Sequence, residues 1–358
     1  MAGFAVRSLA IPIVQAPLAG GPSTVALSAG VIRAGGLGFL AAGYRTADAV
    51  GDDIRALRAA VDGPFGVNLF VPSDRTSDAR TVRAYVDSLA EDARRRGVTL
   101  GAPRADDDGW AQKLDVVCAE HVDVVSFTFG LPPADVIGRV KDSGAAVWVT
   151  VTDVAEARVA VAAGVDALVV QGAEAGGHRA SFSDDAQQDP IALLSLLQLV
   201  GVAVSLPMIA AGSIATGGAI AAVLCAGAEG AQLGTVLMRT PEAGTADVHR
   251  RALASPTGTR LTRAFTGRSA RAIVNRFLEE HSADAPPAYP EIHHVTAPLR
   301  AAGRASGDAD VVNLWAGETH ALSRELPVEE LIRVLVADAR DALSRAGDRL
   351  RSGVLDIE

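Results

Sequence analysis

A candidate catalytic residue, His178, lies in the segment QGAEAGGHR at residues 171–179, directly after the apolar run ALVV. It is the one histidine of the seven that occupies a glycine-rich loop after a predicted strand. An imidazole has an ordinary pKa of about 6.5, so its surroundings can tune it to act as a base near neutral pH. A loop histidine that only packs or caps is the alternative. The neighbouring Arg179 could steer an anion, although surface and salt-bridge arginines are as common in such a position.

Amide side chains at the ends of three apolar runs could bind a flat cofactor with polar edges. Asn68, Gln171 and Gln232 each place a hydrogen-bond donor and an acceptor on one rigid head. That combination suits the edge of an isoalloxazine ring, whose polar atoms alternate. The alternative is that some of these amides satisfy buried backbone groups, which is routine in protein cores.

Small residues at the ends of the last two β-type runs indicate a phosphate site. Gly212 and Ser213 lie at the end of the seventh run, and Gly234 and Thr235 lie at the end of the eighth. In a (β/α)8 barrel these two loops commonly present free backbone N–H groups to a phosphate. Flavin mononucleotide (FMN) has both a flat ring with polar edges and a single terminal phosphate, so we expect FMN as the cofactor.

The elements that must position these residues alternate between short β-type runs and longer helical patterns, which is typical of a parallel sheet built from βα units. The β-type runs are residues 11–17, 37–43, 65–71, 123–130, 146–152, 167–172, 207–212 and 230–235. Eight such units predict an α/β fold of the (β/α)8 TIM-barrel type, with the active site at the carboxyl ends of its strands. A doubly wound open sheet is disfavoured, because the first turn, QAPLAGGPST, lacks the G-x-G-x-x-G spacing of a dinucleotide site.

The regular alternation ends after residue 240. We expect residues 1–240 and 319–358 to form the FMN-binding barrel, and residues 241–318 to form a smaller substrate lobe or lid over its mouth. The segment PVEELIRVLVADARDALSRAG near the end of the chain is predicted to be a helix that returns to the barrel. The acidic run RADDDGW at residues 104–110 is predicted to be a solvated loop.

The composition of the 358-residue chain narrows the class of protein. A net charge of −9 argues against binding to nucleic acid, which usually needs a basic surface. No apolar run approaches the roughly 18 to 20 residues that cross a membrane, and a secretory signal is improbable, so a cytoplasmic location is expected. Cys118 and Cys225 lie in helical patterns and are predicted to be buried. The adjacent His293 and His294 have no ligand cluster around them, so no metal site is expected.

Seven motifs spread in order over residues 15–318 resemble those of the nitronate monooxygenase family, formerly called 2-nitropropane dioxygenases. They are QAPLAGGPST, AGGLGFLAAGY, PFGVNLF, VVSFTFGLPP, VVQGAEAGGHR, AAGSIATGGAIAAVLCAGAEGAQLGT and NLWAGE. The resemblance implies an FMN-dependent barrel that uses dioxygen to oxidise alkyl nitronates, including propionate 3-nitronate, to carbonyl products and nitrite or nitrate. It implies a nitronate or nitroalkane and dioxygen as small-molecule partners, and it leaves a homodimer open.

The family's site residues carry over onto matching positions of this sequence. The catalytic histidine falls on His178, which would take the proton next to the nitro group of a neutral nitroalkane; a nitronate is already an anion and does not need that step. The nitronate would then give one electron to the flavin, and dioxygen would react with the reduced flavin and the substrate radical. The flavin contacts fall on Ala16, Pro17, Asn68, Gln171, Gly176, Gly177, Gly212, Ser213, Gln232, Leu233, Gly234 and Thr235.

Three positions depart from the family pattern. At one of them Ala180 stands where a further glycine is common, and because alanine is also small the loop geometry is expected to survive. Ser213 stands where a second glycine is common, and its hydroxyl could add a contact to the phosphate. Glu318 replaces the glutamine of the usual WAGQ motif, and a carboxylate near the cavity would disfavour an anionic substrate.

Two other functions compete with the family's activity. A flavin-dependent enoyl-acyl-carrier-protein reductase shares the barrel and a similar EAGGH loop, but it is reduced by a nicotinamide cofactor. An FMN-carrying storage or regulatory protein without turnover is a more distant alternative. The SFTFGLPP and NLWAG stretches favour the monooxygenase over the reductase.

Overall fold

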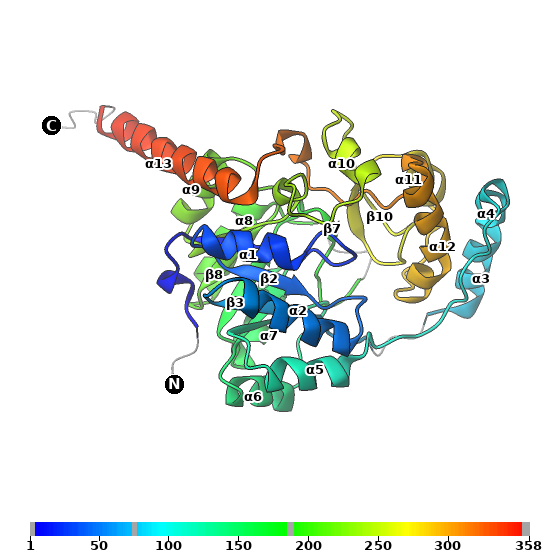
Figure 1. Cartoon of the computed structure of the whole chain (residues 1–358), viewed down its shortest axis with the longest axis horizontal. Helices are drawn as coiled ribbons and strands as arrows, with labels where there is room; N and C mark the ends of the chain where they lie inside the picture. The colour runs from blue at the N-terminus through cyan, green and yellow to red at the C-terminus, as the bar shows by residue number, and fades with distance from the viewer. Residues whose placement is uncertain (1–3, 74–76, 185–189, 353–358) are drawn as a thin grey trace.

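The computed structural model describes residues 4–73, 77–184 and 190–352, and within these ranges eight parallel strands form a barrel (Figure 1). The strands are β1 (Ile13–Gln15), β2 (Gly38–Ala41), β3 (Phe65–Phe70), β4 (Val124–Thr128), β5 (Ala146–Val151), β6 (Ala167–Gln171), β8 (Met208–Ala211) and β9 (Gly230–Leu233). Their order is β1-β9-β8-β6-β5-β4-β3-β2, and each strand lies within one of the predicted β-type runs. The predicted (β/α)8 fold is therefore confirmed.

Hydrogen bonds between β1 and the start of β2 close the barrel. The N–H of Leu37 donates to the carbonyl of Ile13 at 2.9 Å, and the N–H of Gln15 donates to the carbonyl of Leu37, also at 2.9 Å. The side chain of Gln15 is fully buried, and its Oε1 accepts from the N–H of Phe39 at 3.3 Å. Gln15 is thus used to join the two ends of the sheet.

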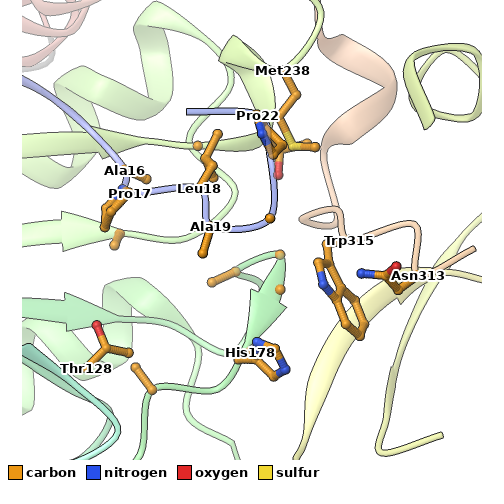
Figure 2. A pocket seen from close by; sticks show the side chains of 18 of the residues that line it. Ala16, Pro17, Leu18, Ala19, Pro22, Thr128, His178, Met238, Asn313 and Trp315 are labelled. Carbon is orange, nitrogen blue, oxygen red and sulfur yellow. The ribbon is translucent and has the colours of Figure 1, made fainter. Parts of the chain in front are cut away.

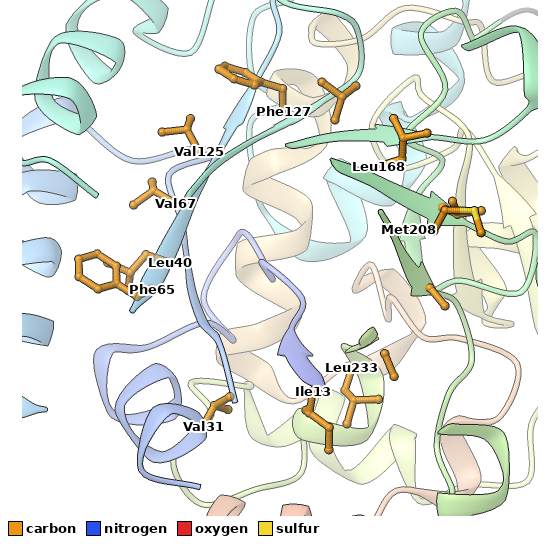
Figure 3. Packing of buried hydrophobic residues seen from close by; sticks show 14 of the residues in the cluster. Ile13, Val31, Leu40, Phe65, Val67, Val125, Phe127, Leu168, Met208 and Leu233 are labelled. Atoms are coloured by element: carbon orange, nitrogen blue, oxygen red, sulfur yellow. The ribbon is translucent and has the colours of Figure 1, made fainter. Parts of the chain in front are cut away.

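Side chains alternate between the inside and the outside of the barrel, because a strand has a period of two residues. The outward side chains pack against the surrounding helices, and Figure 3 shows this layer with Val67 and Val125. The inward side chains fill the barrel with Phe39 and Trp148, whose ring centroids are 5.8 Å apart. Gly66 makes room for this filling, since a Cβ there would lie 2.3 Å from the ring of Phe39.

Helices cover the outside of the barrel. They are α1 (Val25–Arg33), α2 (Ala47–Ala60), α5 (Trp110–Ala119), α6 (Ala134–Asp142), α7 (Val154–Ala162), α8 (Leu193–Ala203), α9 (Gly217–Cys225) and α13 (Val328–Ser352), with the 3-10 turns η1 (Val6–Ser8) and η2 (Thr235–Leu237). The terminal helix α13 packs against α9 and α1, so it returns to the barrel as predicted. None of the helices in the described ranges is long and apolar enough to span a membrane.

The two cysteines differ in their exposure to solvent. Cys118 is half-buried and Cys225 is exposed, and both are free thiols. The prediction that both are buried is therefore wrong. The apolar stretch around Cys225 forms α9, but the buried face of that helix runs through Ile220 and Ala221, and Cys225 lies off that face.

A smaller lobe lies beside the barrel, on the right of Figure 1. Its elements are α10 (Asp247–Leu253), β10 (Thr259–Thr262), β11 (Ala270–Ile273), α11 (Arg276–His281), α12 (Glu291–Ser306), η3 (Ala309–Val311) and η4 (His320–Leu322). The connection between β3 and β4 adds α3 (Ala79–Ser88) and α4 (Ala90–Arg96) to the lobe's own hydrophobic cluster, through residues such as Tyr85 and Leu89. The division of the chain at residues 240 and 318 stays a prediction, but the packing of the lobe draws on residues before 240.

A very short strand, β7 (Gly177–His178), ties the barrel to the lobe. It follows β6 in the chain and forms a second, antiparallel sheet in the order β10-β11-β7. In this sheet His178 pairs with Ala270, and Gly177 pairs with Arg271. The segment that the sequence predicted to be a glycine-rich loop is therefore partly a strand. Two residues are too few to show a periodic pattern in the sequence. They form a strand only because they pair with β11.

Candidate functional site

A cavity of about 510 Å³ lies between the carboxyl ends of the barrel strands and the lobe. All but one of the residues predicted to bind the cofactor or to act as a base line it. They are Ala16, Pro17, Asn68, Gln171, Gly176, Gly177, His178, Gly212, Ser213, Gln232, Gly234 and Thr235. Figure 2 shows the loop that carries Ala16 and Pro17 on one side of the cavity and His178 on another.

Leu233 and Arg179 point away from the cavity. Leu233 is buried in the outer layer of the barrel, next to Ile13 in Figure 3, while the preceding Gln232 faces inward. Any contact of Leu233 with a ligand would have to come from its backbone. Arg179 donates from Nη1 to the carbonyl of Gly172 at 2.8 Å and does not line the cavity. Arg179 therefore braces its own loop and is not placed to steer an anion.

The candidate base, His178, is held by groups of the lobe. Its Nε2 lies 2.9 Å from Oγ1 of the buried Thr266. Its ring lies with centroids 5.3 Å from Trp315 and 5.7 Å from Tyr289, and Figure 2 shows it facing Trp315. Because Nε2 is engaged with Thr266, Nδ1 is the ring nitrogen left to exchange a proton with a substrate.

Burial keeps His178 and two neighbouring histidines uncharged. Burial, together with the positive charges of Arg268 and Arg300, lowers the pKa of His178 to about 3. Burial and Arg300 lower the pKa of His293 to about 2, and burial lowers the pKa of His249 to about 4. All three imidazoles are therefore neutral near pH 7 and are weak bases.

The stability of the protein is expected to fall as the pH is lowered from about 6.5 toward 4. Below their ordinary pKa these three histidines take up protons in the unfolded chain but not in the folded one, so acid favours unfolding. Each lowers the free energy of unfolding by up to about 1.4 kcal/mol per pH unit in that window. Urea unfolding across the window measures the slope. NMR signals of His178, His249 or His293 that titrate near pH 6.5 in the folded protein would contradict the prediction.

The three predicted amides differ in what they can still offer a cofactor. Gln171 is engaged at both ends, since Nε2 donates to the carbonyl of His178 at 3.1 Å and Oε1 accepts from the N–H of Ala180 at 2.9 Å. Asn68 donates from Nδ2 to oxygen atoms of β4. Oε1 of Gln232 is buried and has no hydrogen-bond partner among the described residues. A buried acceptor without a donor costs about 1–3 kcal/mol, so this oxygen is suited to a ligand N–H.

The predicted phosphate loops are held by the segment around Gly317 and Thr319. Oγ of Ser213 donates to the carbonyl of Glu174 at 2.6 Å, and Oγ1 of Thr319 donates to the carbonyl of Ser213 at 2.9 Å. The N–H of Gly317 donates to Oγ1 of Thr235 at 3.0 Å. Ser213 has a φ of 48°, a conformation that favours glycine, and its hydroxyl proton is already used within the protein.

Gly176 is required by the packing of the protein itself. A Cβ there would lie 2.4 Å from the backbone N of Gly317 and 2.5 Å from the carbonyl C of Ala316. The family resemblance placed this glycine among the flavin contacts, where the absence of a side chain would let the flavin come close. The structure shows that another loop of the chain already makes such an approach.

Glu318 is not placed to repel a substrate. Its half-exposed carboxylate lies 3.1 Å from Nη1 of Arg271, and it does not line the cavity. The expected repulsion assumed a carboxylate at the cavity, and the structure places this carboxylate in an ion pair outside the cavity lining; the effect of Glu318 on the substrate stays a prediction. A salt bridge to an arginine 47 positions away in the chain cannot be read from the motif alone.

The sequence analysis did not predict the part of the cavity wall that is formed by the lobe and by the loop after β2. Tyr44 stacks on His293 with ring centroids 4.2 Å apart, and its hydroxyl lies 3.1 Å from that of Tyr289. Burial raises the pKa of Tyr44 to about 12, so this hydroxyl stays protonated. The signal for α12 was present, because its cavity-lining residues recur at the spacing of one helical face. They are His293, Ala297, Arg300 and Arg304.

The acidic run at 104–110 helps to position Tyr44. Oδ1 of Asp108 accepts from the N–H of Tyr44 at 2.9 Å, and its Oδ2 lies 2.7 Å from Nζ of the buried Lys113. The prediction of a merely solvated loop is therefore wrong at Asp108. The carboxylate bridges a lysine of α5 and the loop after β2, which the sequence separates by more than sixty residues.

Comparisons with known proteins identify the family of the chain and proteins of similar fold. The family model described as nitronate monooxygenase matches residues 6–338. A nitronate monooxygenase from Paraburkholderia phytofirmans is 38% identical over 346 residues, with 93% of each chain covered. A solved nitroalkane oxidase from Streptomyces ansochromogenes is 48% identical with a TM-score of 0.93, covering 95% of this chain and 99% of that chain.

The reductase alternative finds weaker support. The enoyl reductase domain of MlnA from Bacillus amyloliquefaciens matches with a TM-score of 0.65 over 95% of this chain and 96% of that chain, but it is 12% identical and shows the shared fold alone. The family match, by contrast, spans nearly the whole sequence. The chain belongs to the nitronate monooxygenase family.

Proposed function

We propose that the protein is an FMN-dependent enzyme that uses dioxygen to oxidise alkyl nitronates to carbonyl products and nitrite or nitrate. The observation that carries the proposal is the cavity, which brings His178 together with the amide of Gln232 and with the small-residue loops after β8 and β9. The names of the relatives, a nitronate monooxygenase and a nitroalkane oxidase, support this substrate class.

The residues of the cavity fit FMN. Oε1 of Gln232 is a buried acceptor without a donor, which an N–H at the edge of a flavin ring would complete. Gly212, with a φ of 136°, and Gly234 begin the two loops where this fold commonly binds phosphate. Bound FMN would supply the electron acceptor for the substrate and the group that reacts with dioxygen.

The chain's own residues bind the substrate and handle its proton. Thr266 fixes the ring of His178, and the neutral imidazole can take the proton next to the nitro group of a nitroalkane. A base with a pKa of about 3 takes a proton from carbon poorly, so the resting cavity favours a nitronate that is already an anion. Trp315 of the lobe and Tyr44 of the loop after β2 line the cavity, where they would limit the contact of the reacting group with water.

Anaerobic mixing of the purified protein with propionate 3-nitronate tests the proposal. We expect FMN to be released on denaturation, the visible flavin band to change on mixing, and nitrite to form once air is admitted. Rapid loss of the flavin band with NADPH and none with the nitronate would overturn the proposal in favour of the reductase.

The proposed partners are a small nitronate or nitroalkane and dioxygen. The homodimer and the cytoplasmic location stay predictions. Light scattering of the purified protein measures the first, and fractionation of the source cells measures the second.

A further inference from the structure

We propose that Arg300 binds the anionic group of the substrate, a planar group in which two oxygen atoms share one negative charge. Both a nitronate and a carboxylate have this form. The inference rests on the proposed function and adds to it the residue that selects anionic substrates. It assigns this role to the lobe, because Arg300 belongs to α12.

The guanidinium of Arg300 is buried, and one side of it is free. The residue is 6% exposed and lines the cavity. Nε donates to Oγ1 of Thr296 at 3.0 Å, and Nη2 donates to the carbonyl of His293 at 2.7 Å. Within the described part of the chain Nη1 makes no hydrogen bond, so the group is oriented from one side and still has donors to offer.

No carboxylate of the described residues forms an ion pair with Arg300. Burial lowers its pKa to about 10, which leaves it charged near pH 7. The groups that face it carry no compensating charge there: His293 is neutral, and burial keeps the hydroxyls of Tyr44 and Tyr289 protonated. A buried charge is costly unless it is paired, so an anion entering the cavity supplies the missing partner.

The other arginines near the cavity are placed differently. Arg304 lies one turn further along α12 and lines the cavity, but it is exposed and its Nη1 donates to Oδ1 of Asn313 at 3.3 Å. Arg268 lies 4.1 Å from the centre of the Phe129 ring and does not line the cavity. Arg300 is thus the buried cation of the cavity wall. A guanidinium presents paired N–H donors that match the two oxygens of a nitronate or carboxylate.

Binding of nitrate to the oxidised holoenzyme, measured by calorimetry, tests the site without turnover. Arg300→Gln is expected to weaken nitrate binding about 10- to 100-fold, because a charge-assisted hydrogen bond is lost. Arg304→Gln, which removes the same charge from an exposed position on the same helix, should weaken it less than about threefold. Equal losses in the two variants would mean that the general positive field binds the anion, and the assignment to Arg300 would fall.

A matched pair of substrates identifies which anion is bound. The anions of 1-nitropropane and of 3-nitropropionate differ by a carboxylate. An increase in KM of about tenfold or more for both in Arg300→Gln places the nitronate on Arg300, and an increase for the second alone places the carboxylate there. Unchanged nitrate affinity and unchanged KM for both would overturn the proposal.

Two further outcomes have to be distinguished: a variant that does not fold, and a failure of the proposed function that leaves the anion site intact. If Arg300→Gln does not fold, Arg300→Lys takes its place, and a several-fold loss of nitrate binding is expected because the ammonium keeps the charge but not the paired donors. Unchanged nitrate binding in that variant would overturn the proposal. If the wild-type protein binds nitrate through Arg300 but oxidises neither nitronate, the anion site stands and the proposed function fails.

Discussion

Replacement of His178 by asparagine is expected to lower the oxidation of neutral nitroalkanes by about 10²-fold, the lower end of the usual contribution of a positioned general base, because its low pKa makes the imidazole a weak base. Oxidation of a nitronate prepared in advance should fall by less than about tenfold, because no proton has to be removed from carbon. The rates of nitrite release from 1-nitropropane and from its anion measure the two losses in the same variant.

Thr266→Val is the matched control for this experiment. It keeps the imidazole of His178 but removes the hydroxyl that lies 2.9 Å from Nε2. We expect a smaller loss with the neutral nitroalkane than in His178→Asn, and little change with the nitronate. Equal losses of the two substrates in His178→Asn would mean that the histidine mainly shapes the cavity and is not mainly a base.

Replacement of Gly176 by alanine is expected to destabilise the protein by about 1–3 kcal/mol and to lower its flavin content. The added Cβ would lie within 2.5 Å of backbone atoms of Ala316 and Gly317, which cannot move aside as a flexible side chain could. Since Gly317 also donates to Thr235, a shift here moves the loop after β9. Activity should fall about 100-fold if His178 is displaced by about 1 Å.

Gly258→Ala is the control for this substitution. Gly258 has no atom within 4 Å of the position of an added Cβ. The midpoint of thermal unfolding and the ratio of FMN to protein are the measurements, and both should stay close to those of the wild type in the control. A Gly176→Ala variant that matches the wild type in both would show that the contact between the two loops relaxes without cost.

The barrel and most of the cavity residues could be predicted because they follow local rules. Each barrel strand lies in a β-type run of the sequence, and glycine, amide and histidine residues fall where strands end. The same rules also explain the exceptions. Side chains alternate along a strand, so Gln232 faces the cavity and Leu233 does not. Applying this two-residue alternation within the motif would have predicted that Gln232 and Leu233 face opposite sides of the barrel wall.

The remaining features depend on contacts between distant segments. Gln171 looked free to meet a cofactor, but its amide holds the backbone at His178 and Ala180, which depends on how the loop folds back. The salt bridge of Glu318 and the hydrogen bond from Tyr44 to Asp108 also join segments that no motif connects. The lobe wall is different, since the helical spacing from His293 to Arg304 was present in the sequence.

The pairing of β7 with β11 has a consequence for how the enzyme opens. Gly177 and His178 are hydrogen-bonded into a sheet of the lobe, and the N–H of Arg179 extends this pairing by donating to the carbonyl of Ser269 at 2.8 Å. A hinge motion that moved the lobe away from the barrel would have to break these hydrogen bonds or move His178 together with the lobe. Substrate exchange that leaves the base in place therefore does not use a hinge motion of the whole lobe. Amide hydrogen exchange at β7 should be as slow as in β11 during turnover.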